Sequence, residues 1–320
     1  MNRIWRANIF LLVFVAAMIA VFLILSITPV DTTGVKYLIG MSQCNLGEPW
    51  RIQMNKDIMS AAEKYSNVKI IFTDAAQNNQ KQIEDVKKLM QLGIDLLIIS
   101  PNETEPLTPA ISEAYGQIPV IVLDRKVNSD DFTLFIGADN RVIGAAAGAY
   151  VKKILGQAGG NIVEIMGLPG SMPTTERSEG FRQGVFTNPN IRIVGEITAD
   201  WLRDKAEDGF KEFLSNNEGL AIDIVFAHND PMALGAYRAA RGVGRGSDMV
   251  FVGIDGLIGD EGGINLVRDG VIDITFIYPT GGEEAIEYAM RLLKGERFEN
   301  KQIMLENIQI DKSNYYIFGE

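Results

Sequence analysis

Polar side chains directly follow an apolar run in the second half of the chain, and they are well placed for binding chemistry. The apolar run at 224–227 is typical of a buried parallel strand. His228, Asn229 and Asp230 come immediately after it. Asp230 is expected to cap a helix in which Pro231 takes the first position. Because ligands of open α/β sheets bind at the carboxyl ends of strands, this stretch predicts a binding site.

The same arrangement recurs after other apolar runs. Asp124 and Arg125 follow the run at 120–123, and Asp255 follows the run at 250–254. Carboxylate, amide and guanidinium groups make short, directional hydrogen bonds with hydroxyl groups, which sugars carry around the whole ring. The pattern therefore predicts a pocket rich in hydrogen-bonding groups.

Two tryptophans lie beside these polar groups in the predicted arrangement. Trp50 and Trp201 each follow a predicted strand and loop, and Arg51 is next to Trp50. Sugar rings have apolar C–H faces and polar rims, so their binding combines flat aromatic faces with bidentate polar groups. The set favours sugar binding, and ordinary packing of the two tryptophans is the alternative that the sequence leaves open.

The chain lacks common sequence signatures of catalysis. It has no Gly-x-Ser-x-Gly motif and no P-loop, and the glycine-rich stretch 242–246 follows a helix rather than a strand. His228 could be a general base, but without an evident nucleophile a neutral hydrogen-bonding role is expected. Asp124, Asp230 and Asp255 could form a catalytic carboxylate pair or accept hydrogen bonds from sugar hydroxyls, and the sequence does not separate these uses.

Composition narrows the possible partners. The 320 residues carry a formal net charge of −11 and include one histidine and one cysteine. Net negative charge opposes a nucleic-acid surface. A lone cysteine forms no internal disulfide, and one His with one Cys makes a zinc site improbable. We therefore expect no metal, no cofactor and no nucleic-acid partner.

The N-terminal 30 residues predict a membrane anchor. Arg3 and Arg6 precede seventeen unbroken apolar residues at 9–25. This run exceeds the apolar part of a signal peptide, about 7–15 residues, and reaches the lower limit of a membrane helix, about 17–25 residues. Pro29 follows the only plausible cleavage point. We expect an uncleaved single-pass anchor at 1–30 with the globular part outside the cell membrane, a cleaved signal peptide being the alternative.

From residue 36 onward, short apolar runs alternate with amphipathic segments, which is typical of βα units around parallel sheets. The expected strands are 37–41, 68–72, 96–99, 119–123, 132–136, 161–166, 191–197, 224–227, 249–253 and 272–278, with extended pieces at 302–318. The expected helices are 50–65, 77–92, 107–115, 142–155, 174–186, 203–216, 230–241, 264–269 and 283–293. A loop at 156–160 separates two series of similar size, so the pattern predicts an α/β fold of two doubly wound lobes around a ligand cleft.

Six short motifs occur in order along both series. They are Ser42-Gln43 with Pro49-Trp50-Arg51, Leu123-Asp124-Arg125, Ala138-Asp139-Asn140, the run from Thr175 to Phe181, the run from Ala227 to Ala233, and Gly253-Ile254-Asp255-Gly256. In this order and spacing the chain resembles the type I periplasmic-binding-protein family, in the branch that binds ribose, galactose and xylose.

The resemblance implies a ligand held between the two lobes and a set of contact residues. It implies stacking by Trp50 and Trp201, with Glu48 in place of a loop amide. Arg177 either contacts the ligand or pairs with a nearby carboxylate. The full set of candidate ligand-binding residues is Gln43, Glu48, Trp50, Arg51, Asp124, Arg125, Thr175, Arg177, Trp201, Asn229, Asp255 and Tyr278, and no residue is expected to be catalytic.

The family resemblance also implies three crossings between the lobes, near Asp139, Pro279 and Asp311. The N-terminal lobe would then comprise 35–138 and 280–308, and the C-terminal lobe 139–279 and 309–320. Closure on the ligand would be a hinge motion around these crossings.

Departures from the family pattern bear on which sugar is bound, and the anchor bears on which membrane partner receives the signal or the sugar. Thr175 stands where ribose binders have an arginine, and Tyr278 lies where they have a glutamine, so another pentose such as xylose, or a hexose, is expected. With the anchor and its short tether, the chain resembles membrane-anchored sugar receptors that work with a sensor histidine kinase. The solute-binding component of a sugar ABC importer, which would work with an ABC permease, is the alternative. A sugar hydrolase or isomerase and a LacI-type repressor core are less compatible with these features.

Overall fold

The computed structural model describes residues 34–318. The chain divides into two units, Met1–Lys36 and Tyr37–Glu320, and the elements below all belong to the second unit. The predicted anchor at 1–30 lies outside the described residues. Among the residues that are described, no helix combines the length and the apolar character that crossing a bilayer requires.

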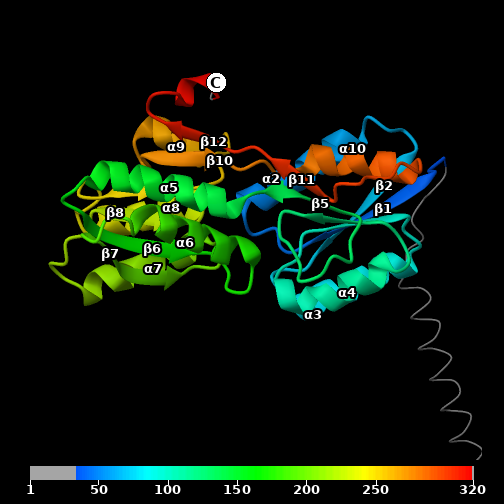
Figure 1. The fold of residues 1–320 in the computed structure, drawn as a ribbon, viewed down its shortest axis with the longest axis horizontal. Helices are drawn as coiled ribbons and strands as arrows, with labels where there is room; N and C mark the ends of the chain where they lie inside the picture. The colour runs from blue at the N-terminus through cyan, green and yellow to red at the C-terminus, as the bar shows by residue number, and fades with distance from the viewer. Residues whose placement is uncertain (1–33, 319–320) are drawn as a thin grey trace, which may run out of the picture. The chain divides into compact units, whose positions relative to one another are not determined.

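The first sheet consists of six parallel strands in the order β11-β5-β4-β3-β1-β2 (Figure 1). Its strands are β1 (Tyr37–Gln43), β2 (Val68–Asp74), β3 (Leu96–Ile99), β4 (Val120–Leu123), β5 (Leu134–Ala138) and β11 (Gln302–Leu305). Helices α2 (Pro49–Ala62) and α10 (Gly282–Leu293) pack together on one face, and α3 (Asn79–Gln91) and α4 (Thr104–Tyr115) pack on the other. Helices thus cover both faces, and the inner strands β3, β4 and β5 are buried along their whole length.

The second sheet also has six strands, in the order β12-β10-β9-β8-β6-β7. They are β6 (Gly160–Met166), β7 (Ile191–Thr198), β8 (Ile224–Ala227), β9 (Val250–Val252), β10 (Ile274–Ile277) and β12 (Ile308–Asp311), which runs antiparallel to β10. Helices α5 (Asn140–Leu155) and α6 (Met172–Val185) cover one face. Helices α7 (Arg203–Asn216), α8 (Asp230–Gly242) and α9 (Gly263–Asp269) cover the other, and a short 3-10 helix, η1 (Tyr315–Ile317), follows β12.

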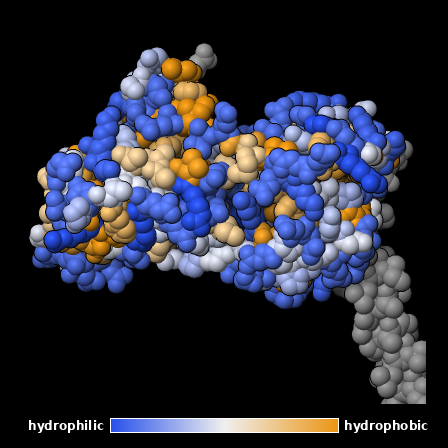
Figure 2. Space-filling view, viewed as in Figure 1, coloured by the Kyte–Doolittle hydropathy of each residue, from blue (hydrophilic) through white to orange (hydrophobic). Residues whose placement is uncertain are grey.

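The central position of β8 in its sheet explains why its sequence is apolar throughout. Ile224 and Phe226 pack in the cluster that includes α5 and α6, whereas Val225 and Ala227 pack against α7 and α8. Side chains alternate across a strand, so a central strand covered on both faces needs apolar residues at every position. The surface seen in Figure 2 is by contrast mostly hydrophilic, so the apolar residues are concentrated on the two faces of each sheet.

The predicted alternation of strands and helices is confirmed: the protein has two α/β lobes built on parallel sheets. The chain passes from the first sheet to the second between Leu305 and Ile308, a few residues before the crossing expected near Asp311. Strands β11 and β12 are separated by only two residues but join different sheets.

The predicted N-cap of α8 is wrong by one residue. Asn229 is the cap, and its Oδ1 accepts a hydrogen bond from the N–H of Met232 at 2.9 Å. Asp230 is the first helical residue, and its carboxylate instead accepts hydrogen bonds from Thr275 and Gly256. Asn and Asp are nearly equal as caps, so the sequence alone could not choose between them.

Helices α5 and α6 approach each other through glycines, and this contact places Arg177 of α6. A Cβ atom at Gly180 of α6 would lie 2.2 Å from the carbonyl oxygen of Arg141, and one at Gly144 of α5 would lie 2.2 Å from that of Arg177. Because both neighbours are backbone atoms, only glycine allows the two helices to pack this closely.

Substituting Gly180→Ala should therefore destabilise the protein by about 1–3 kcal/mol, because the added methyl group must push the two helices apart. Urea denaturation of the purified protein measures this. Gly242→Ala at the end of α8 is a matched control, since a Cβ there meets nothing within 4 Å. The control should be neutral or slightly stabilising. Equal midpoints for Gly180→Ala and the wild type would show that the helix contact is not tightly packed.

Candidate functional site

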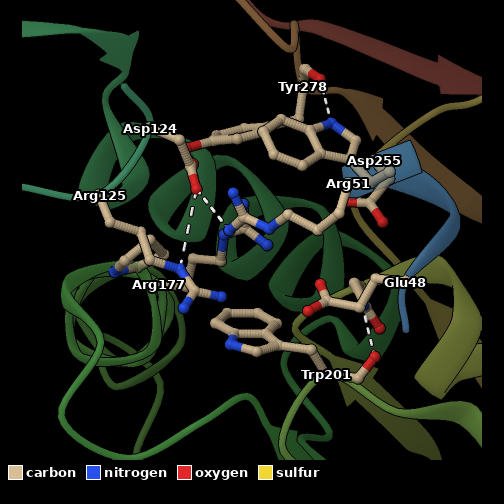
Figure 3. A pocket seen from close by; sticks show the side chains of 11 residues that line it. Glu48, Arg51, Asp124, Arg125, Arg177, Trp201, Asp255 and Tyr278 are labelled. Atoms are coloured by element: carbon tan, nitrogen blue, oxygen red, sulfur yellow. Dashed lines mark hydrogen bonds and ion pairs between the residues drawn. The ribbon is translucent and has the colours of Figure 1, made fainter. Parts of the chain in front are cut away.

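Loops at the carboxyl ends of strands in both sheets surround one small cavity, where the empty space, open solvent included, is about 280 Å³. Figure 3 shows the labelled side chains turned toward one another around this space. The cavity is lined by Glu48, Trp50, Arg51, Asp124, Arg125, Pro173, Arg177, Trp201, Asn229, Asp255 and Tyr278. Three guanidinium groups and three carboxyl groups thus surround one small space.

The polar residues reach the cavity from the loops that follow strands and from the first turns of the helices after those loops. Asp124 and Arg125 follow β4, Asn229 follows β8, and Asp255 and Tyr278 come after β9 and β10. Glu48 and Arg51 lie at the start of α2, and Arg177 lies in the second turn of α6. The carboxyl ends of the two sheets therefore supply the whole site, as expected for doubly wound lobes.

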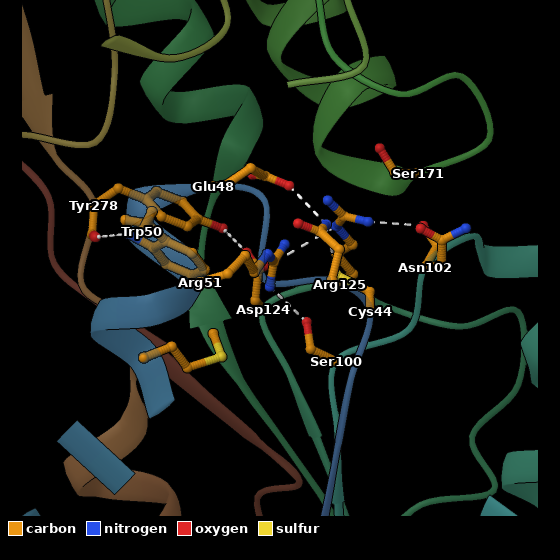
Figure 4. Close-up of polar contacts among 12 residues, drawn as sticks. Cys44, Glu48, Trp50, Arg51, Ser100, Asn102, Asp124, Arg125, Ser171 and Tyr278 are labelled. Carbon is orange, nitrogen blue, oxygen red and sulfur yellow. Dashed lines mark hydrogen bonds and ion pairs between the residues drawn. The ribbon is translucent and has the colours of Figure 1, made fainter. Parts of the chain in front are cut away.

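Asp124 is held by a buried ion pair. An Arg51 NH2 group lies 2.6 Å from Asp124 Oδ2, and the Tyr278 hydroxyl donates to Oδ1 at 2.6 Å. Arg51 also donates to Ser100 Oγ at 2.7 Å (Figure 4). Burial opposes ionisation of Asp124, but Arg51 and Arg125 together with the hydrogen bonds outweigh it and hold the pKa of this carboxyl below its usual value. Asp124 is therefore a fixed carboxylate that orients Arg51.

The aromatic residues are surrounded by cationic groups. The guanidinium carbons of Arg125 and Arg177 lie 5.6 and 5.4 Å from the ring centroid of Trp201, within the range of cation–π contacts. Trp50 donates from Nε1 to the carbonyl of Tyr278 at 2.8 Å, and their ring centroids are 5.3 Å apart. Charged and aromatic groups thus alternate around the cavity, which suits a ligand with both polar edges and apolar faces.

Several buried polar atoms of the cavity have no hydrogen-bond partner within the described part of the chain. They are Arg51 Nε, Arg125 Nε, Trp201 Nε1 and Asp255 Oδ2. Leaving a buried donor or acceptor unpaired costs about 1–3 kcal/mol. Because the set contains three donors and one acceptor, it is complementary to a ligand that offers both acceptor and donor groups.

Asp255 combines unfavourable electrostatics with an unusual backbone. It is 6% exposed, and its φ of +141° is one that residues other than glycine rarely adopt. Burial and, second, the nearby charge of Asp230 raise the pKa of Asp255 well above its ordinary value, although Arg177 acts in the opposite direction. Backbone strain, an unpaired oxygen and a raised pKa at one residue point to a functional role.

The structure brings ten of the twelve predicted site residues to the cavity. The two others are elsewhere. Gln43 donates from Nε2 to Asn55 Oδ1 at 3.0 Å, and Thr175 is exposed on α6. Pro173 lines the cavity but was not predicted. The sequence feature that could have identified Pro173 is its place in the first turn of α6, directly after a strand and loop.

His228 has the hydrogen-bonding role expected from the sequence. Its Nδ1 accepts from the N–H of Gly167 at 3.4 Å, which leaves Nε2 to donate to Glu164 Oε1 at 3.0 Å. Burial lowers the pKa of His228 despite the opposing effect of Glu164, so the imidazole is neutral at pH 7. Arg177 donates to the carbonyl of His228 and to Asn140 Oδ1, so neutral oxygens accept the hydrogen bonds of its guanidinium.

Comparison with known proteins places this fold and site in a family. The model of the periplasmic binding protein domain matches residues 39–297. The ribose import binding protein RbsB of Bacillus subtilis (strain 168) is 30% identical over 267 residues, which are 82% of this chain and 84% of that protein. The chain therefore belongs to the periplasmic binding protein family, and the resemblance recognised in its motifs is confirmed.

Two solved structures are similar over most of the chain. The fructose-binding periplasmic domain of the hybrid two-component system BT1754 is 42% identical, with a TM-score of 0.83, and the match covers 88% of this chain and 92% of that one. A protein from Mycobacterium smegmatis in complex with β-D-fucofuranose is 30% identical, with a TM-score of 0.82 and coverage of 88% and 93%.

Substituting Asp255→Asn should stabilise the protein without ligand at neutral pH by about 1 kcal/mol, because it removes a buried carboxylate with an unpaired oxygen. The pKa of Asp255 is raised in the folded state above the unfolded value of about 3.9. The wild type therefore loses stability relative to the variant as pH rises above about 4, and the difference vanishes in more acidic solution.

Urea denaturation between pH 4 and pH 8 measures this difference. Asp131→Asn, at an exposed position, is the matched control and should leave stability nearly unchanged. A variant that is less stable than the wild type throughout this range would mean that Asp255 is well paired in the folded protein.

Proposed function

We propose that the chain is an extracytoplasmic, membrane-tethered receptor for a monosaccharide, which closes on the sugar and signals to a sensor histidine kinase. The observation that carries the sugar-binding part is the small cavity in which indole, guanidinium and carboxyl groups present buried polar atoms without partners. The proposal includes no catalytic residue, metal or cofactor.

The charge balance of the cavity favours a neutral ligand. Arg51, Arg125 and Arg177 face the carboxyl groups of Glu48, Asp124 and Asp255. A ligand with a phosphate or carboxylate group would meet Glu48 and the ionised Asp124 as well as the arginines, and like charges at short distance cost several kcal/mol in a buried site. A polyol has no net charge and both donates and accepts hydrogen bonds, so it suits the mixed lining.

The ligands named for the similar proteins favour a single sugar ring. The similar proteins are a ribose import binding protein, a fructose-binding domain and a protein in complex with β-D-fucofuranose. The proposed ligand is accordingly a pentose, such as xylose, or a hexose.

Hydrogen bonds between segments that follow strands of the two sheets support the proposal of hinge closure. Gln77, after β2, donates from Nε2 to the carbonyl of Asp200, after β7, at 3.0 Å. The N–H of Thr104 donates to the carbonyl of Gly170 at 3.0 Å. Opening the hinge would break both bonds and expose the cavity. The lobes proposed from the sequence, 35–138 with 280–308 and 139–279 with 309–320, would move as the two rigid parts.

An enzymatic function is less well supported than binding. Asp124 has both carboxylate oxygens engaged, by Arg51 and by Tyr278, and Asp230 does not line the cavity. Glu48 is the remaining carboxyl group beside Asp255, and its Oε1 accepts a hydrogen bond from Asn45 Nδ2 at 2.7 Å. The arrangement favours holding a sugar over cleaving it.

Two observations bear on the output. The similarity to a periplasmic domain of a hybrid two-component system favours signalling, and the similarity to an import binding protein favours delivery to an ABC permease. The predicted anchor at 1–30 and its short tether would keep the lobes close to the membrane, which suits a membrane-bound sensor. Exposed apolar side chains around the β11–β12 crossing, Met304 and Ile308, are of the kind that protein partners cover.

Isothermal calorimetry with aldopentoses, aldohexoses and fructose tests ligand binding. One sugar should bind per chain, and Asp124→Ala or Asp255→Ala should weaken binding by at least about 2 kcal/mol. The first leaves Arg51 and Tyr278 unpaired, and the second removes an acceptor for ligand hydroxyls. Trp50→Ala and Trp201→Ala should also weaken binding. Asp131→Ala is the control with an exposed carboxylate. Absence of binding by the wild type to every sugar of the panel would refute the proposal.

Co-purification with the extracellular part of a sensor kinase, with and without the bound sugar, tests the output. Sugar should strengthen the association if the kinase recognises the closed form. Two ligands that prefer the same form must increase each other's affinity by the same factor. Unchanged association, together with loss of the sugar response when a permease is deleted, would favour the importer instead.

A further inference from the structure

Asp230 is a buried carboxylate that the cavity does not use. It is 1% exposed and does not line the cavity. Within the described residues its hydrogen-bond donors are neutral: the Thr275 hydroxyl at 2.7 and 2.9 Å from its two oxygens, and the Gly256 N–H at 2.8 Å from Oδ2. A buried carboxylate without an ion pair is costly, so its presence calls for an explanation other than packing.

Two glycines leave the space that this carboxylate fills. A Cβ atom at Gly253 would lie 2.1 Å from Asp230 Oδ1, and one at Gly263 would lie 1.9 Å from Oδ2. Any side chain at either position would displace the carboxylate. The surrounding backbone is thus shaped around Asp230, which connects α8 to the turn after β9 and to β10.

That turn carries Asp255 into the cavity. Asp255 is bonded through its backbone to β10, since its N–H donates to Phe276 and its carbonyl accepts from Tyr278, both at 3.0 Å. Its neighbour Gly256 is held by Asp230. We propose that Asp230 is a positioning residue of the ligand site, an inference that rests on the proposed sugar-binding function. Asp230 clamps the turn at 253–256 so that the carboxyl group of Asp255 points at the ligand.

The charge of Asp230 should also change the number of protons released when ligand binds, which a merely structural clamp would not do. Burial raises the pKa of Asp230 to about 6, against the hydrogen bonds from Thr275 and Gly256, so this group is mostly ionised at pH 7. Burial and then the charge of Asp230 raise the pKa of Asp255.

The other charged groups that act on Asp255 are Arg177 of α6, Glu48 before α2 and Arg51 of α2. Ligand hydroxyls that donate to Asp255 favour its ionised form. Binding should therefore release a proton from Asp255 to the buffer, and removing the charge of Asp230 should reduce that release.

The experiment is calorimetry of the full chain at pH 7 in buffers of different ionisation enthalpy, with D-ribose, D-xylose and D-fructose as probes. Asp230→Ala should lower affinity at least about tenfold, because the Gly256 N–H and the Thr275 hydroxyl both lose their acceptor and the turn loses its side-chain link to α8. Asp230→Asn, which keeps one acceptor, should lower affinity less but release fewer protons than the wild type. Thr275→Val should weaken binding, and Thr275→Ser, which keeps the hydroxyl donor, should restore it.

Wild-type affinity in a folded Asp230→Ala variant would overturn the positioning role. Weakened binding with unchanged proton release in Asp230→Asn would show that Asp230 does not act through Asp255. A double-mutant cycle of stability, measured without ligand, tests the link between Asp230 and Asp255 independently of whether the proposed sugar binding is correct. The rise in urea midpoint caused by Asp255→Asn at pH 7.5 should fall by at least half in the Asp230→Asn background. Without that coupling the inference fails, whether or not a sugar binds.

Discussion

The pairing of buried charge around one small cavity is the constraint on which the rest of this structure depends. Three arginines and three acidic residues meet there, and isolated charges are very unfavourable away from water. Arg51 reaches Asp124 across the first sheet, and Tyr278 closes over the same carboxylate after the chain has left the second sheet. Satisfying Asp124 therefore requires both sheets to present their carboxyl ends to a common space.

Backbone strain is concentrated at the same edge of the sheets. In the described part of the chain, the residues other than glycine with left-handed φ values are Ala76, Gln77, Asp124, Asp200, Trp201 and Asp255. They follow strands β2, β4, β7 and β9, and three of them line the cavity. Such conformations each cost about 1–3 kcal/mol and persist only where the surroundings impose them. The strand ends are thus shaped for the site and not for local stability.

Site residues here also reduce stability in ways that a ligand can relieve. Asp255 has a buried oxygen without a partner, and the neighbouring Asp230 adds a second buried carboxylate whose donors are neutral. A protein selected for stability alone would replace such groups. In the proposed receptor, a ligand that supplies the missing hydrogen bonds would favour the closed arrangement over the open one, which would link affinity to closure.

The sequence by itself determined the class of fold and the edge of the sheets at which the site lies. Apolar runs such as 224–227 alternate with amphipathic segments, and polar residues follow the runs, because strand periodicity and burial are local properties of the chain. Only the tertiary structure decided which side chains meet. It places Pro173 in the cavity, leaves Gln43 and Thr175 outside it, and turns Asp230 from a predicted cap into a clamp. The physical reason is distance along the chain: Trp50 and Tyr278, which share a hydrogen bond, are 228 positions apart, and no local pattern reports such a contact.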